Sequence, residues 1–77
     1  MKRSEALALL KELRANFTSI EPTQFVLLRN PEKKGFWELD IMWVPGKQEK
    51  EKLFKLAKIH RLDLTFKDGK TTLRRST

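Results

Sequence analysis

Basic side chains are concentrated in the last part of this sequence, and their type and spacing suit them to bind an anionic partner. The segment 47–61, KQEKEKLFKLAKIHR, repeats lysine at helical spacing, and further basic residues follow up to Arg75. Lysine and arginine contact nucleic-acid phosphates and displace counterions from them. We therefore predict a nucleic-acid-binding surface. Its candidate residues are Lys47, Lys50, Lys55, Lys58, Arg61, Lys70, Arg74 and Arg75, and the segment 30–35 adds Lys33 and Lys34.

The charge distribution supports this location. The formal net charge is +7 and the isoelectric point is about 10.1. Residues 1–44 contain seven basic and six acidic residues, a balance of +1, whereas residues 45–77 contain ten basic and four acidic residues, a balance of +6. No base-reading recognition helix can be identified, so the expected contact is to phosphates or to shape. The alternative is that the basic residues only keep a small protein soluble.

Two tryptophans in the segment 35–46, GFWELDIMWVPG, raise a second possibility. Strand alternation places Trp37 and Trp43 on one face together with Leu39 and Ile41. The tryptophan rings could stack on nucleic-acid bases. Glu38 and Asp40, which lie between the tryptophans, point to the opposite face of the strand. If that face is the outer face of the sheet, these acids would repel a phosphate backbone. The uniformly apolar face is therefore predicted to form the core.

Carboxylates and a histidine are the candidates for catalysis. Glu38 and Asp40 share one strand face, where they could hold a divalent metal with Asp63 as a third ligand. His60 is the only histidine, and a packing or helix-capping role is favoured over general-base catalysis because no nucleophile accompanies it. The sequence has no cysteine and no phosphate-cradling glycine loop. We expect no enzymatic activity, no metal, no cofactor and no small-molecule substrate.

Exposed apolar residues give an alternative function. Phe25, Leu27 and Met42 are predicted on the outer face of the sheet, which is a large apolar surface for a small monomer. A protein partner or a second copy in a homodimer would cover it. The alternative function is thus a protein-protein interaction module, such as an accessory subunit or small inhibitor, using a strand edge or this outer face.

Helical periodicity and turn residues define six elements. The segment 4–17 is predicted as a helix capped by Ser4, and the segment 47–62 as a second helix. Strands are expected at 24–29, 36–44, 61–67 and 70–75, the last two joined by an Asp68-Gly69 turn. The predicted inward residues are Ala6, Leu7, Leu10, Leu13, Phe17, Val26, Leu28, Leu53, Leu56, Ala57, His60, Leu62, Leu64, Phe66 and Leu73.

The element order α-β-β-α-β-β predicts an α+β fold. We expect a two-layer sandwich in which two helices cover one face of a four-stranded antiparallel sheet, similar in topology to a permuted ferredoxin-like domain. The last strand should insert beside the second, leaving the first and third at the edges. This topology by itself implies no function.

The length of 77 residues fits one domain, residues 1–77. No apolar stretch is long enough to span a membrane, and the first residues lack the features of a signal peptide. The absence of cysteine fits a reducing compartment. We therefore expect a soluble, cytoplasmic protein without a membrane partner.

Overall fold

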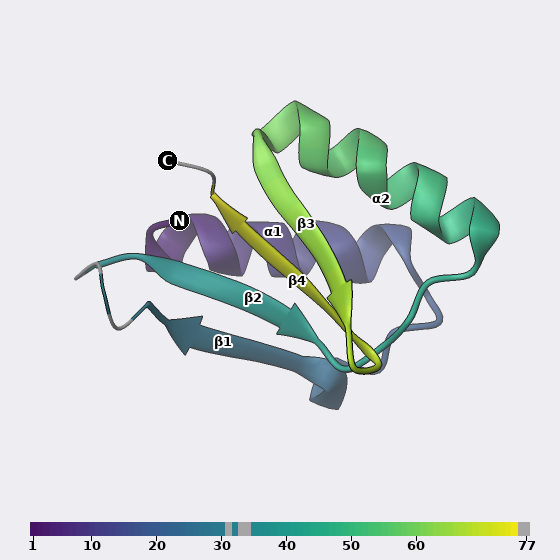
Figure 1. Ribbon diagram of the computed structural model, residues 1–77, viewed down its shortest axis with the longest axis horizontal. Helices are drawn as coiled ribbons and strands as arrows, with labels where there is room; N and C mark the ends of the chain where they lie inside the picture. Colours follow the sequence, from purple (N-terminus) through teal and green to yellow (C-terminus); the bar gives the residue numbers. More distant parts are fainter. Residues whose placement is uncertain (31, 33–34, 76–77) are drawn as a thin grey trace.

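The computed structural model describes residues 1–30, 32 and 35–75, and in them two helices cover one face of a four-stranded antiparallel sheet (Figure 1). The predicted α+β fold and its element order are confirmed. Lys33 and Lys34 lie outside the described residues. The elements are α1 (Arg3–Asn16), the 3-10 turn η1 (Pro22–Gln24), β1 (Phe25–Arg29), β2 (Trp37–Ile41), α2 (Lys47–His60), β3 (Leu62–Lys67) and β4 (Lys70–Arg75).

The sheet order is β1-β2-β4-β3, so the last strand inserts beside the second as predicted. The turn between β3 and β4 places Asp68 at φ 53° and Gly69 at φ 74°. Two successive positive φ angles define a two-residue hairpin turn that suits Asp-Gly. This turn sets the register of the hairpin, with Leu64 opposite Leu73 and Asp63 opposite Arg74. The two edges of the sheet are β1 and β3.

Helix α1 buries a different set of leucines from the predicted one. Ala6, Leu9 and Leu13 are buried, whereas Leu7 is exposed. The segment ALALL offers an apolar residue at every position, so periodicity could not fix which side faces the sheet. The predicted Ser4 cap is also wrong, because Lys2 precedes the first helical residue and no side chain caps the helix start.

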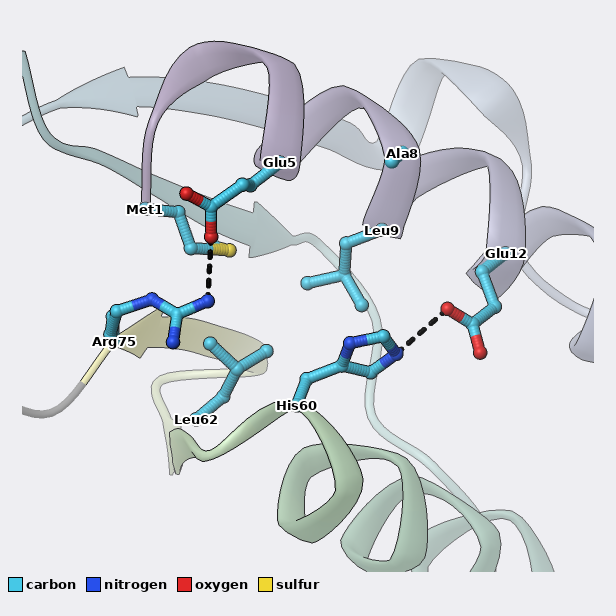
Figure 2. A pocket seen from close by; sticks show the side chains of 8 residues that line it. All are labelled: Met1, Glu5, Ala8, Leu9, Glu12, His60, Leu62 and Arg75. Atoms are coloured by element: carbon cyan, nitrogen blue, oxygen red, sulfur yellow. Dashed lines mark hydrogen bonds and ion pairs between the residues drawn. The ribbon is translucent and has the colours of Figure 1, made fainter.

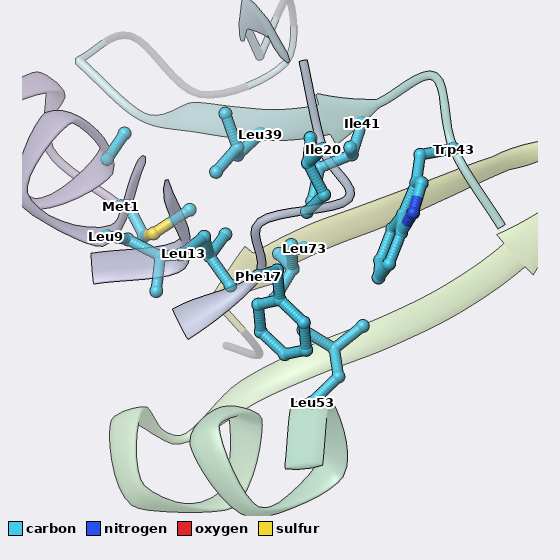
Figure 3. Packing of buried hydrophobic residues seen from close by; sticks show 11 residues of the cluster. Met1, Leu9, Leu13, Phe17, Ile20, Leu39, Ile41, Trp43, Leu53 and Leu73 are labelled. Atoms are coloured by element: carbon cyan, nitrogen blue, oxygen red, sulfur yellow. The ribbon is translucent and has the colours of Figure 1, made fainter. Parts of the chain in front are cut away.

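The core lies between the helices and the sheet (Figure 3). Leu39, Ile41 and Leu73 present fully buried side chains from the two central strands. Trp43 is 9% exposed and meets Phe17 edge to face, with ring centroids 5.6 Å apart. This confirms the core interpretation for Trp43.

Trp37 lies at the opposite end of β2 and is half-buried against the core. The guanidinium carbons of Arg3 and Arg29 lie 5.9 and 5.6 Å from its ring centroid. Both tryptophans therefore face the helix side of the sheet, which places them away from the outer face.

The two faces of β1 are the reverse of those predicted. Leu27 lies opposite the buried Leu39, so Leu27 and its alternate neighbour Phe25 face the helices. Val26 and Leu28 are 37% and 42% exposed on the outer face. The strand begins with four apolar residues in succession, so alternation carried no information about its faces. The predicted core positions of Val26 and Leu28, and the predicted outer-face positions of Phe25 and Leu27, are therefore wrong.

β2 ends at Ile41, three residues before the predicted Val44. The Trp43 amide donates to the Ile41 carbonyl at 2.8 Å, which turns the chain toward the core. Met42 remains exposed on the outer side, as predicted. None of the described helices is both long and apolar enough to cross a membrane.

Candidate nucleic-acid interface

Helix α2 has one buried side and a broad exposed side. Leu53 and Ala57 are its buried residues, and Leu56 and His60 are half-buried beside them. The helix begins after Gly46, whose amide donates to the Glu49 side chain at 3.1 Å. Nearly all the remaining positions face solvent, and half of them are lysines. The sheet therefore fixes α2 through a narrow apolar strip and leaves its basic residues available.

Basic residues align along the exposed flank of α2 that lies next to β3. The residues that follow one another at three- and four-residue spacing lie on one side of a helix. The Lys50 ammonium lies 4.7 Å from the centroid of the Phe66 ring, which places this flank beside the edge strand β3. We call the basic residues of this flank the basic stripe. They are Lys47, Lys50, Lys58 and Arg61.

The basic stripe runs nearly the length of the helix. At a rise of ~1.5 Å per residue, Lys47 and Arg61 are separated by about 20 Å along the axis. Arg61 ends the helix with φ 56° and ψ 50°, the left-handed conformation common at helix C-termini. Glu51 is the acidic residue at this spacing, four residues after Lys47, and the four basic side chains outnumber it. Four positive charges can therefore follow several consecutive phosphates of one strand.

Phe54 also belongs to this surface, although it is not among the candidate residues predicted from the sequence. It lies within the basic stripe and is 50% exposed. One side of its ring meets Phe66 edge to face, with centroids 5.9 Å apart. An exposed ring among ammonium groups can stack on an unpaired base while the lysines contact the phosphates. Its spacing of four residues from both Lys50 and Lys58 was the available signal in the sequence.

The other lysines of α2 point elsewhere. Lys52 donates to the backbone carbonyl of Asn16 at 3.1 Å and lies 5.5 Å from the Phe17 ring centroid, which ties α2 to α1. Lys55 is exposed on the side of the helix that faces away from the sheet. Lys55 can therefore add to the field of the basic stripe, whereas Lys52 belongs to the helix packing.

The predicted basic residues of β4 are not brought together with the basic stripe. The Lys70 ammonium lies 3.4 Å from an Asp40 carboxylate oxygen on the outer face of the sheet. Arg74 lies on that same face, opposite Asp63. Arg75 faces the helices. The eight predicted residues therefore divide into a helix group and a sheet group.

A cavity of about 170 Å³ lies where the two helices diverge (Figure 2). Its apolar floor includes Leu9 and Leu62. His60 lies at its rim with Nε2 2.8 Å from a carboxylate oxygen of Glu12. This contact joins the end of α2 to the middle of α1, which gives His60 a packing role.

An ion pair closes the opposite rim of the same cavity. The Arg75 guanidinium donates to Glu5 at 2.6 Å (Figure 2). This hydrogen bond lowers the pKa of Glu5 below its usual value of 4.5, although partial desolvation acts in the opposite direction. The folded state thus favours the ionised carboxylate. Its contribution to stability is present above the unfolded pKa and is lost as the pH falls through the lower, folded pKa.

We expect an NMR titration to detect this interaction directly. The Glu5 carboxyl should titrate below pH 4.5, and Arg75→Gln should move its midpoint upward because the charged donor is lost. Glu49 is a matched control, since the Ser19 hydroxyl and the Gly46 amide lower its pKa at a separate place. An unchanged Glu5 midpoint in Arg75→Gln would contradict the assigned ion pair.

The three carboxylates considered for a metal site remain apart. Glu38 and Asp40 lie on the outer face of β2, and β4 separates them from Asp63 on β3. Within residues 1–30, 32 and 35–75, no three histidine, aspartate or glutamate side chains are grouped as metal ligands. Asp40 is only 4% exposed, and its Oδ1 atom has no hydrogen-bond partner among the residues that the structure describes. These acids make the outer face less favourable for a phosphate backbone than α2.

The basic stripe and the β1 strand lie at opposite edges of the molecule. Helix α2 packs beside β3, while β1 forms the other edge of the sheet (Figure 1). The exposed apolar residues Val26, Leu28 and Met42 belong to the β1–β2 side.

Comparison of the chain with protein-family models, with curated proteins and with solved structures found no match.

Proposed function

We propose that this protein is a small, non-catalytic, cytoplasmic binding domain that contacts nucleic acid or a nucleoprotein through α2. The observation that carries the proposal is the basic stripe, in which four basic side chains share one exposed flank and outnumber its one acid, Glu51. The mechanism is phosphate contact with counterion release. Lys55 and the basic residues of β4 add to the long-range attraction, since opposite charge steers the partner toward the domain.

The chemistry of the stripe favours binding with little sequence preference. Lysine is a flexible point charge that follows a backbone but does not distinguish bases in fixed geometry. Phe54 adds a ring that can stack on any base. The proposed ligand is therefore a nucleic-acid backbone, with an advantage for strands whose bases are accessible.

A titration of labelled single- and double-stranded DNA and RNA tests the proposal. We expect saturable binding at low salt, with affinity falling about 50- to 150-fold between about 50 and 200 mM salt for four phosphate contacts. Fluorescence anisotropy measures both the affinity and its salt dependence. A lack of binding to all four nucleic acids at low salt would remove this function.

A second candidate function is protein interaction through the β1–β2 side. The outer face there exposes apolar residues on both strands, and the hydrogen bond from the Asn30 amide to the Phe36 carbonyl at 2.9 Å continues the strand pairing beyond β1. We call these exposed residues the hairpin patch. They are Val26, Leu28, Phe36 and Met42. Binding there would depend weakly on salt and would be sensitive to substitutions in the hairpin patch.

A further inference from the structure

We propose that the free edge of β1 pairs with β1 of a second copy of this chain, so that two four-stranded sheets join into one continuous sheet. The inference rests on the second candidate function, for which it names the partner. It is independent of nucleic-acid binding by α2.

Alternate residues of β1 point their backbone groups away from β2. The Met42 amide donates to the Gln24 carbonyl at 2.8 Å, and the Asn30 amide donates to the Phe36 carbonyl at 2.9 Å. In an antiparallel ladder, hydrogen-bonded pairs recur at every second residue, so positions 24, 26, 28 and 30 bond to β2. The amides and carbonyls of Leu27 and Arg29 and the carbonyl of Phe25 consequently face the free edge, whereas the Phe25 amide donates to the Pro22 carbonyl at the end of η1.

This edge lacks the features that normally prevent strand pairing. Edge strands are usually protected by charged residues, proline or bulges. β1 reads FVLLR, with its only charge at the end. The Arg29 guanidinium lies over the Trp37 ring at 5.6 Å, which directs this charge back over its own sheet.

The other edge strand, β3, is protected. It exposes Asp63 and Lys67, and the basic stripe of α2 runs alongside it. A second copy approaching there would meet a surface of like charge. Of the two edges, β1 is therefore the one open to pairing.

One register pairs the whole of β1. Antiparallel pairing that includes all five residues places Leu27 opposite Leu27 of the second copy and Val26 opposite Leu28 of the second copy. The exposed side chains of Val26 and Leu28 would then form one apolar row across both outer faces. Pairing would also give the free amides of Leu27 and Arg29 hydrogen-bond acceptors on the second copy.

Charge favours a second copy paired through this edge. Residues 17–46 contain three basic and four acidic residues, a balance of −1, whereas residues 47–75 contain ten basic and four acidic residues, a balance of +6. Pairing through β1 joins the nearly neutral parts of two chains and keeps the two α2 helices at opposite ends (Figure 1). Contact through the α2 side would bring two strongly positive surfaces together.

Sedimentation velocity of the full chain without nucleic acid tests the proposal. We expect a mass near twice 9.1 kDa at high concentration, with dissociation on dilution. Val26→Lys with Leu28→Lys should give a 9.1 kDa species throughout. The register places these two positions opposite Asp40 and Glu38 of β2, so the lysines suit the monomer but face each other in the dimer. Leu7→Lys with Ile59→Lys is the control, because it makes the same charge change at exposed sites outside the sheet and should leave the dimer intact.

Hydrogen exchange of the wild-type protein gives an independent measurement that needs no variant. The amides of Leu27 and Arg29 should become protected as concentration rises, while those of Val26 and Leu28 should be protected at all concentrations. A 9.1 kDa mass at every concentration would overturn the proposal. So would a dimer retained by the double lysine variant, or exchange at Leu27 that does not depend on concentration. None of these results bears on nucleic-acid binding by α2.

Discussion

Reversing two charges of the basic stripe, with Lys47→Glu and Lys58→Glu together, is expected to weaken nucleic-acid binding by about 100-fold at low salt. Each substitution removes a phosphate contact with its counterion release and adds repulsion, which we estimate at about tenfold per site. Both residues are exposed, so the fold should be retained. Anisotropy titrations of the wild-type and variant proteins measure the change.

The matched control changes the same net charge on α1. Lys11→Glu with Arg14→Glu alters two exposed residues of α1. Glu12 is the α1 residue that points toward α2, where it contacts His60, and Lys11 and Arg14 lie on the side of α1 that faces away from α2. We expect a small loss of affinity from the lower overall charge. Equal losses in the two double variants would show that net charge, and not the basic stripe, determines binding.

Leu53→Ala is expected to lower the free energy of unfolding by about 2 to 5 kcal/mol. Leu53 is fully buried and is one of only two buried residues of α2 within the described part of the chain. A protein of this size has a total stability of roughly 4 to 12 kcal/mol, so the loss is a large fraction of it. Urea denaturation followed by circular dichroism measures this change.

The same variant tests whether nucleic-acid binding depends on the position of α2 on the sheet as well as on its charges. Leu53→Ala keeps every basic residue but weakens the attachment of the helix to the sheet, so we expect weaker binding at temperatures where the variant begins to unfold. Ile59→Ala is the control, since Ile59 is 73% exposed and its truncation should change stability by less than about 0.5 kcal/mol. Equal stability of the two variants would contradict the packing assigned to Leu53.

The topology could be predicted because the local signals were strong and consistent. Pro45-Gly46 separates the second strand from α2, and Asp68-Gly69 sets a two-residue turn between β3 and β4. The turn fixed the register of that hairpin, and alternation fixed the inward face of β2. The strand order then followed from the analogy with a permuted ferredoxin-like sheet.

The faces of β1 and α1 could not be predicted, because both are locally uniform in apolar character. In FVLL each residue is apolar, so only pairing with β2 decides that Phe25 and Leu27 turn toward the helices. In ALALL the choice between Leu7 and Leu9 depends on how the helix rests on the sheet. Tertiary contacts determine both choices.

The helix that carries the candidate site could be predicted from the sequence, but the separation of its basic residues from those of β4 could not. Helical spacing alone indicates that Lys47, Lys50, Lys58 and Arg61 share a flank. The separation of this flank from Lys70, which pairs with Asp40, depends on the sheet order and on contacts between distant segments.

The most direct test of the central claim is the dependence of affinity on salt, compared between the wild-type protein and the Lys47→Glu, Lys58→Glu variant. Four phosphate contacts predict a slope of log affinity against log salt of about −3 for single strands and about −3.6 for duplex DNA. Removing two contacts should reduce its magnitude by about half. A slope that is the same in both proteins would contradict nucleic-acid binding through the basic stripe.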